Sequence, residues 1–247
     1  MFGLFSKKKN DQIAVNFATI KTDMHSHLLP GIDDGAPDMD TSLHLIEGLK
    51  NIGYSKIITT PHIFWDMYKN TPDIVHKKLD EVHIAMKKKG LEIEIEAAAE
   101  YYLDEHVDDL LQKKEPLLTF HNNMVLVEFS VLHMSNNMKE VIFDLLMAGY
   151  QPVLAHPERY TYLNYNRDVF DELKANGCMF QLNLLSVAGG YGKSVKELAT
   201  YFLKGNFYSL VGTDMHHTGH LERLKTFTAP PELHDLLSGQ ELLNPKL

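Results

Sequence analysis

Side chains that bind metal ions recur along this sequence, and each follows a short apolar run. The first two are His25 and His27, in the stretch Asp-Met-His-Ser-His. Two histidines alone hold a metal weakly, because zinc sites in proteins usually have three or four protein ligands. Later apolar runs end in further residues of ligand type, namely His62, Glu100, Glu128, His156, Asp214 and His216. We therefore expect one metal centre built from residues that are far apart in the sequence.

The spacing of these residues indicates the elements that position them. From His27 the successive intervals are 35, 38, 28 and 28 residues, each about one strand plus one crossover. The interval from His156 to Asp214 is 58 residues, close to two such units, as expected if the sixth strand ends without a ligand. The chain has 14 histidines, so any single one near a strand end has a simple structural explanation. A series at successive strand ends does not.

Between the ligands, β-branched or apolar runs alternate with amphipathic patterns. We predict strands at 17–23, 56–60, 93–98, 124–129, 152–155, 179–184 and 208–212. We predict helices at about 38–52, 72–90, 104–114, 136–148, 167–176 and 194–205, and a last one from near 220. Such alternation is typical of parallel strands with helical crossovers, and seven units can be counted. In a (β/α) barrel, chemistry gathers at the carboxyl ends of the strands.

Composition restricts the class of protein. The 247 residues, 44% hydrophobic and 23% charged, suit one large soluble domain, and no linker divides them. We expect an N-terminal extension at 1–19 and a single barrel domain at 20–247.

The net charge of -9 argues against nucleic acid as a partner, and one cysteine excludes a disulfide framework or a cysteine-rich zinc site. With no secretory signal pattern and no apolar run of roughly 20 residues, we expect a cytoplasmic protein without a membrane span. The oligomeric state is left open.

The chemistry that such a centre favours is phosphoester hydrolysis. Eight ligands exceed the needs of one ion, so we expect two or three divalent ions. In such clusters one ion lowers the pKa of a bound water to make hydroxide, and others neutralise the phosphate oxygens. Other phosphatase signatures fail. Cys178 has no arginine six residues on, as a thiol-based phosphatase loop requires, and Asp38 is better explained as a helix N-cap than as an aspartyl nucleophile.

A family resemblance follows from these motifs together. Asp-Met-His-Ser-His…Asp-Asp-Gly, Thr-Thr-Pro-His, Ala-Glu-Tyr-Tyr, Val-Glu-Phe-Ser, Ala-His-Pro-Glu-Arg-Tyr and Thr-Asp-Met-His resemble, in order, the PHP (polymerase and histidinol phosphatase) superfamily. More narrowly they are similar to its bacterial protein-tyrosine phosphatases of capsular and exopolysaccharide synthesis. The resemblance implies a distorted TIM-like (β/α)7 barrel, of the α/β class, that holds three divalent metals. The usual metals are manganese, iron, magnesium or zinc, and mixed histidine and carboxylate ligands do not choose among them.

The resemblance also implies a set of ligands for each ion. One ion would be held by His25, His27, Glu100 and Asp214, a second by Asp33, His62 and His216, and a third by Glu100 (bridging), Glu128 and His156. In this scheme Asp34 and Gly35 shape a turn, and Asp23 supports the histidines by hydrogen bonding.

Arginines complete the implied catalytic set. Arg159 matches the family's phosphate-binding arginine, whose planar guanidinium fits phosphate oxygens. The family often has a second arginine shortly after Thr-Asp-Met-His, but here Arg223 is shifted by about two residues. Either Arg223 or His220 takes that role, or neither does. His216 or a metal-bound water would protonate the leaving group.

Our main hypothesis is a metal-dependent phosphomonoesterase that acts on phosphotyrosine, with a polysaccharide-associated bacterial tyrosine kinase as the substrate protein. Tyrosines near the strand ends would pack on the phosphotyrosine ring, namely Tyr101, Tyr102, Tyr160 and Tyr162. Two alternatives stay open. One is a small-molecule phosphatase such as a histidinol-phosphate phosphatase, and the other is a catalytically silent module that binds a protein partner.

Overall fold

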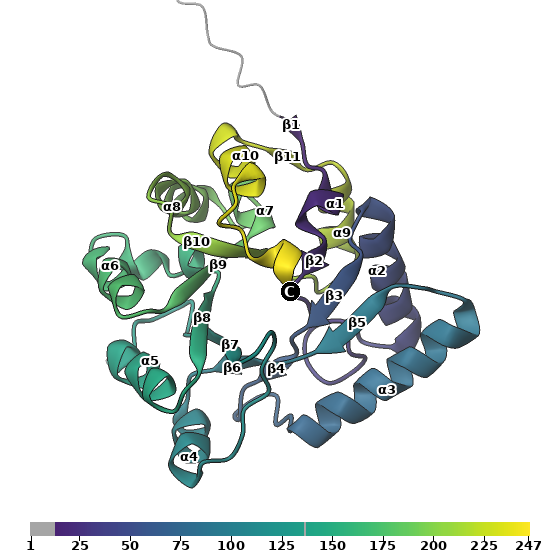
Figure 1. Cartoon of the computed structure of the whole chain (residues 1–247), viewed down its shortest axis with the longest axis horizontal. Helices are drawn as coiled ribbons and strands as arrows, with labels where there is room; N and C mark the ends of the chain where they lie inside the picture. Colours follow the sequence, from purple (N-terminus) through teal and green to yellow (C-terminus); the bar gives the residue numbers. More distant parts are fainter. Residues whose placement is uncertain (1–12, 136) are drawn as a thin grey trace, which may run out of the picture.

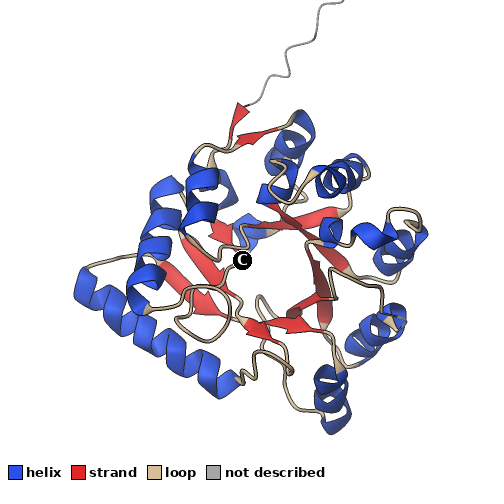
Figure 2. Cartoon of the chain, turned by 180° about the vertical axis from the view of Figure 1, so that it is seen from behind, coloured by secondary structure: helices blue, strands red, loops and turns tan. Residues whose placement is uncertain are grey.

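Parallel strands form a ring in this protein, and helices cover its outside (Figure 1, Figure 2). The computed structural model describes residues 13–135 and 137–247. Each of the seven predicted units contains a strand: β2 (Thr22–Asp23), β3 (Lys56–Thr59), β5 (Glu94–Ala97), β7 (Met124–Glu128), β8 (Gln151–Ala155), β9 (Met179–Asn183) and β10 (Tyr208–Gly212). The fold is the expected α/β type, a distorted TIM-like (β/α)7 barrel.

The distortion arises where two strands break. After β3 the chain continues into β4 (His62–Ile63), and after β5 into β6 (Glu100–Tyr102). Proline has no N–H to donate to a ladder, and Pro61 lies at the first break. One sheet therefore has the order β2-β3-β5, and the other has the order β10-β9-β8-β7-β6-β4. The second strand of each broken pair begins with a candidate ligand, and His62 lies opposite Glu100 in the β4–β6 register.

The helices lie where the amphipathic patterns predict them. They are α2 (Met39–Ile52), α3 (Pro72–Lys89), α4 (Glu105–Lys113), α5 (Met138–Met147), α6 (Asp168–Ala175), α8 (Lys193–Lys204) and α9 (Thr218–Lys225). Local chemistry explains several ends. Asp38 caps α2 as expected, since its carboxylate accepts the Thr41 N–H at 2.8 Å, and Gly90 ends α3 in the left-handed conformation with φ 69°. Shorter elements complete the chain: α7 (Leu184–Val187), α10 (Pro231–Ser238), η1 (Pro157–Arg159), η2 (Thr161–Leu163) and η3 (Asn244–Lys246).

Alternating strand residues build two apolar layers. Ile57, Leu154 and Val211 belong to the large core shared with the helices. Their neighbours along the strands form a smaller buried cluster at the centre of the ring, with Met24, Ile58, Ala98, Leu126, Val153 and Leu210. Successive side chains of a strand point to opposite faces of the sheet, so a strand with both faces buried places alternate residues in the two apolar layers. The inner cluster fills the ring, so the carboxyl ends of the strands are left as the place for a site.

The first and last strands of the ring meet without a continuous ladder. An isolated bridge joins Ser26 to Met215, and the Asp214 N–H donates to the His25 carbonyl at 2.8 Å. Further down, Asn244 lies buried between the two strands and hydrogen-bonds to the backbone of Thr22 and Val211. The C-terminal segment thus covers the amino end of the ring, and Figure 1 shows it at the centre.

The N-terminal segment differs from the prediction. We expected a strand over 17–23, but residues 17–20 form a helical turn, α1 (Phe17–Ile20), because Asn16 caps the Ala18 N–H and favours helix there. Of the extension expected at 1–19, residues 1–12 lie outside the described part, and β1 (Ile13–Ala14) pairs with β11 (Thr228–Ala229). Phe17 is buried against Tyr54. Among the described helices, none has the length and apolar character needed to cross a membrane.

Candidate metal centre

Glu100 lies at the centre of a buried cluster of histidines at the carboxyl ends of the strands. Its Oε2 is 3.0 Å from His25 Nε2 and 3.3 Å from both His27 Nε2 and His62 Nδ1. Its Oε1 is 3.1 Å from His156 Nε2. One carboxylate therefore contacts four imidazoles from three strand ends, which places Glu100 at the centre of the donor atoms.

The other predicted carboxylates lie around this centre. Asp214 Oδ1 is 3.4 Å from His25 Nε2 and 3.3 Å from His216 Nδ1. Glu128 Oε1 is 3.3 Å from His62 Nδ1. All eight residues picked out by their positions at strand ends are brought together. Together with Asp34, their donor atoms form four groups able to hold an ion: His27–Asp34–His62–His216, His25–His27–Glu100, His25–His156–Asp214 and His62–Glu100–Glu128.

The cluster fits divalent metal ions on its own chemistry. Within the described residues, His62 Nδ1 is buried and makes no hydrogen bond, although oxygens of Glu100 and Glu128 each lie 3.3 Å from it. A buried polar atom without a partner costs about 1–3 kcal/mol, which coordination of a cation would offset. Burial, and after it the neighbouring Glu100 carboxylate, raises the pKa of Glu128 well above its usual range. Two carboxylates this close repel each other when both are ionised, and bound metal ions would offset that repulsion.

Asp33 does not lie where the resemblance placed it. Its buried carboxylate faces the far side of an imidazole, with Oδ2 2.8 Å from His27 Nδ1, and it also accepts the N–H groups of His62 (3.1 Å) and Gly35 (3.0 Å). Both oxygens are occupied, so Asp33 orients His27 rather than joining a group of donors. Although burial opposes ionisation, His27 holds the pKa of Asp33 below its usual value.

Asp34 takes the position that we expected for Asp33. Its Oδ1 is 3.4 Å from both His62 Nε2 and His216 Nε2, and its side chain is half exposed at the mouth of the cluster. The assignment of Asp33 as ligand and Asp34 as turn residue is therefore reversed by the geometry. Adjacent residues in a tight turn point in opposite directions, and the residue types alone do not say which one points inward.

The sixth strand was expected to end without a ligand, and its polar residues support the ligands of other strands. Gln181 donates through its amide nitrogen to the Leu182 carbonyl, so its Oε1, 2.9 Å from His25 Nδ1, is an acceptor. The imidazole of His25 then carries its proton on Nδ1 and presents Nε2 to the cluster. Asn183 Nδ2 donates to Asp214 Oδ2 at 2.8 Å. The signal that could have revealed them is two amides within an otherwise apolar strand.

Asp23 and the backbone also hold the ligands in place. We expected Asp23 to support the histidines, and the backbone of His25 does stabilise its carboxylate. Asp23 also accepts the N–H (2.9 Å) and the hydroxyl (2.6 Å) of Thr213, directly before Asp214. Burial raises the pKa of Asp23 to about 6. His156 and Asp214 adopt positive φ values of 33° and 50°, which non-glycine residues rarely do and which cost about 1–3 kcal/mol each. The fold retains this strain where the two side chains turn into the cluster.

Arg159 lies beside the cluster in a cavity of about 640 Å³. Its Nη1 is 3.2 Å from Asp214 Oδ2, and its guanidinium lies over the ring of Tyr191 at 4.9 Å from the centroid. The side chain is 27% exposed, so the remaining N–H groups face the cavity. A cation held next to the ligands in this way is placed to bind an anion there.

Arg223 does not reach this cavity. It is exposed on α9 and lines a separate hollow with Lys196, on the other side of the loop that carries Tyr191. The structure therefore does not bring Arg223 to the cluster, because its position on α9 turns the side chain towards the separate hollow. His220 lines the site cavity instead, with Nδ1 3.1 Å from the Asp214 carbonyl, and burial lowers its pKa to about 4.

Of the four tyrosines predicted near the site, Tyr102 lines the cavity. Tyr101 and Tyr160 are buried in the core, and Tyr162 donates its hydroxyl to the Ser130 carbonyl.

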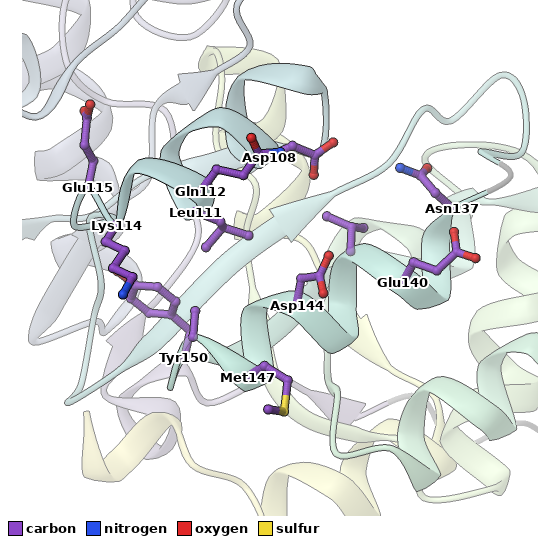
Figure 3. Close-up of a pocket in the computed structure, with 12 residues that line it drawn as sticks. Asp108, Leu111, Gln112, Lys114, Glu115, Asn137, Glu140, Asp144, Met147 and Tyr150 are labelled. Carbon is purple, nitrogen blue, oxygen red and sulfur yellow. The ribbon is translucent and has the colours of Figure 1, made fainter.

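A larger cavity, of about 830 Å³, lies between α4 and α5 (Figure 3). It carries carboxylates such as Asp108 and Asp144, but none of the four candidate metal groups. The chemistry is thus at the strand ends.

Comparison with known proteins agrees with this geometry. The family model described as "Capsular polysaccharide synthesis, CpsB/CapC" matches residues 21–226. The chain belongs to the CpsB/CapC family. It is 30% identical to the tyrosine-protein phosphatase YwqE of Bacillus subtilis over 79% of this chain and 77% of the relative. It is also 30% identical to the tyrosine-protein phosphatase CpsB of Streptococcus agalactiae serotype V, over 79% and 82%.

Solved structures extend the comparison to the fold. Crystal structures described as those of YwqE from B. subtilis and CpsB from Streptococcus pneumoniae, "unique metal-dependent tyrosine phosphatases", include a chain with a TM-score of 0.77. That chain is 27% identical, and the match covers 89% of each. An amidohydrolase from Mycoplasma synoviae matches with a TM-score of 0.53 at 13% identity and shares the fold alone. The family resemblance predicted from the motifs is confirmed.

Proposed function

We propose that this protein is a metal-dependent phosphomonoesterase that hydrolyses phosphotyrosine in proteins. The observation that carries the proposal is the buried cluster around Glu100 with Arg159 beside it in one open cavity. Metal ligands and a phosphate-binding cation are the two components that phosphoester hydrolysis needs. Relatives that cover most of the chain are named tyrosine-protein phosphatases, which supports phosphotyrosine as the substrate.

The ligand sets that we propose are those that the family resemblance implies, with Asp34 in place of Asp33. We assign Asp34, His62 and His216 to one ion, His25, His27, Glu100 and Asp214 to another, and Glu100, Glu128 and His156 to the third. Two or three divalent ions bound there would supply an activated water and positive charge for the phosphate oxygens. Manganese, iron, magnesium and zinc all accept such ligands.

The protein's own residues orient the substrate. Arg159 would exchange its contact with Asp214 for the phosphate oxygens, while Asn183 keeps a hydrogen bond to the same Asp214 oxygen. The Tyr191 ring beneath the guanidinium holds its plane during that exchange. Phenolate is a good leaving group, with a pKa of about 10, so a weak acid is enough to protonate it. His216 is assigned to an ion and its Nδ1 lies 2.9 Å from the Asp214 carbonyl, so it has no free N–H for this step and water is left as the proton donor.

The substrate protein that we propose is a bacterial tyrosine kinase of polysaccharide synthesis, because the family model carries that process in its description. Tyrosine kinases use ATP, so we propose that the two proteins meet in the cytoplasm. The competing small-molecule phosphatase and silent partner-binding module have weaker support. The relatives named above are protein phosphatases, and the complete set of candidate ligands has no use in a silent module.

Relative turnover of a phosphotyrosine peptide and histidinol phosphate tests this function. We expect the purified protein, loaded with manganese, to hydrolyse the peptide at least tenfold more efficiently, and a chelator to abolish both activities. An Arg159→Lys variant should raise KM for the peptide, because an ammonium does not copy the planar fork. Equal or greater activity on histidinol phosphate would exclude the tyrosine assignment, and full activity in excess chelator would exclude metal dependence.

A further inference from the structure

The site cavity has two unlike walls. The wall from β8 and β10 is cationic and polar, with Arg159, His216 and His220. The other wall comes from β6 and from the segments that follow β4 and β7. Most of its side chains are aromatic or aliphatic, namely Phe64, Met67, Tyr68, Tyr102, Phe129, Val131 and Leu132, and Ser130 and His133 lie among them. A phosphate bound by Arg159 would therefore have an apolar surface across the cavity from it.

The apolar wall extends beyond the cavity into solvent. Leu132 is 85% exposed and Met67 is 64% exposed. Trp65 and Met134, which are also exposed, lie on the same two loops, although the Trp65 ring stacks on His106 and lines a separate cavity. In the part of the chain that the structure describes, four of the nine exposed large apolar side chains thus lie on these loops. Single exposed apolar residues need no explanation, but a group at the edge of a pocket marks a binding surface.

Hydrogen bonds hold both loops in position, so the exposure is built into the fold. In the first loop, Phe64 and Tyr68 exchange backbone hydrogen bonds of 3.2 and 2.6 Å, and the Phe64 ring stacks on Tyr102 at 4.0 Å. This turn carries Met67 at its tip. In the second loop, the Leu132 N–H donates to Ser130 Oγ at 3.2 Å. Tyr162 then anchors that loop through the Ser130 carbonyl at 2.9 Å.

We propose that Met67 and Leu132 form a substrate-recognition surface for an apolar side chain next to the phosphotyrosine. This inference rests on the proposed function, and it adds the class of phosphoprotein segment. With its phosphate at Arg159, a phosphotyrosine would lay its ring on the aromatic wall and bring its neighbouring residues to the rim. There an apolar neighbouring residue would cover Met67 and Leu132. A charged neighbouring residue would lose its hydration at this surface without gaining an ion pair or a hydrogen bond. Methionine has an unbranched, adaptable side chain, so the surface accepts apolar residues of several shapes.

Matched phosphotyrosine peptides test the proposal. One peptide carries leucine on both sides of the phosphotyrosine, and the other carries aspartate there. We expect the wild-type enzyme to prefer the leucine peptide about tenfold in kcat/KM. A Met67→Ser, Leu132→Ser double variant should reduce the preference to about twofold or less. Its turnover of free phosphotyrosine should stay within twofold, because neither side chain belongs to the metal cluster.

A control variant separates local recognition from a general loss of surface apolarity. Ile84→Ser with Met147→Ser removes two side chains of similar size that are 71% and 70% exposed, on α3 and α5, and neither lines the site cavity. It should keep the tenfold preference.

Three results would overturn the proposal: no preference in the wild type, a preference unchanged in the rim variant, or an equal loss in the control. A rim variant that changes the oligomeric state and not the peptide preference would assign the surface to a second copy of the chain, and would also overturn it. Failure of the proposed function is distinguishable, because the wild type would then not hydrolyse free phosphotyrosine.

Discussion

Asp33 and Asp34 are adjacent in the sequence but have different environments. Asp33 is buried against His27, whereas Asp34 faces His62 and His216 at the mouth of the cluster. We predict that Asp34→Asn removes a ligand and lowers kcat at least 100-fold even in excess metal. Asp33→Asn should weaken metal affinity about 10–100-fold, as is typical when a residue that orients a ligand is lost, and excess metal should restore activity. Titration of activity with manganese measures both.

If Asp33→Asn were the variant that excess metal fails to rescue, the ligand assignment of the family resemblance would stand and the geometry would be contradicted. Glu47→Gln serves as a control for the loss of a carboxylate, since Glu47 pairs only with Lys89 on the surface. Its manganese titration should match that of the wild type.

Cys178 provides a second test at this scale. It is 3% exposed, and burial raises the pKa of its thiol to about 12. At pH 8 only about one thiol in 10⁴ would then be the reactive thiolate, and access is blocked as well. We predict that iodoacetamide leaves the folded protein unlabelled and fully active, and labels it after denaturation. Rapid labelling at pH 8 with loss of activity would revive the thiol-based mechanism.

Sequence reasoning at the residue scale found the ligand types and their order, because strand ends in a barrel converge. It did not find Gln181 and Asn183, which bind no metal and act only through hydrogen bonds to His25 and Asp214. It also misplaced Arg223, whose direction depends on where α9 begins. These errors share one cause, since the direction of a side chain follows from backbone angles that residue type does not specify.

At the level of single elements, the loop after β2 is tightly packed around Gly35. A Cβ on Gly35 would lie 2.1 Å from the carbonyl oxygen of His27 and 2.4 Å from its Cβ, so the loop cannot keep its path with alanine there. We predict that Gly35→Ala shifts Asp33 and Asp34 together, lowers metal content, and reduces the free energy of unfolding by about 2–4 kcal/mol. Metal analysis and urea denaturation measure the two effects.

Gly90→Ala is the matched control for this substitution. Gly90 ends α3 with a left-handed φ of 69°, and a Cβ there would meet nothing within 4 Å. It should cost about 1 kcal/mol of stability and leave metal content unchanged. Equal metal content in the Gly35→Ala protein would show that the loop tolerates the displacement.

Most elements were predictable, because apolar period and capping chemistry agree along most of the chain. The strand β10 has the predicted bounds, and α2 and α3 differ from theirs by one residue. The strand expected at 17–23 is an exception, since the apolar residues Phe17 and Ile20 are spaced as on a helical turn as well as in a buried strand. Apolar runs this short do not distinguish the two.

For the whole molecule, the meeting of the first and last strands is the critical contact. Asn244 Nδ2 donates to the carbonyls of Thr22 (2.9 Å) and Val211 (2.7 Å), and its Oδ1 accepts the Val211 N–H at 2.9 Å. We predict that Asn244→Ala destabilises the protein by about 2–4 kcal/mol, because it leaves buried backbone groups without partners. Denaturant unfolding measures this, and Asn51→Ala on the exposed surface of α2 should stay within about 0.5 kcal/mol. A loss no larger than that control would mean that the barrel does not depend on the C-terminal segment.

The contact between the first and last strands could not be predicted from the sequence. Asn244 follows the last predicted unit, and it lies more than 200 residues along the chain from its partner Thr22. The α/β class of fold could be predicted, since alternating strands and helices imply a parallel sheet with helical crossovers. The seven-stranded barrel is what the family resemblance implies. We propose that the domain starts near residue 13 rather than at residue 20, because β1 and Phe17 contact the body of the protein.

The central claim is that the cluster around Glu100 binds the metals that make this protein a phosphotyrosine phosphatase. Glu100→Gln tests it most directly, because the change keeps the shape of a side chain that contacts four histidines and removes its charge. Metal content and phosphotyrosine-peptide hydrolysis are measured on the same folded samples of wild type and variant. We predict two or three divalent ions per wild-type chain, the loss of at least one in the variant, and a fall in kcat/KM of at least 1,000-fold, about 4 kcal/mol. A folded variant with full metal content and wild-type activity would contradict it.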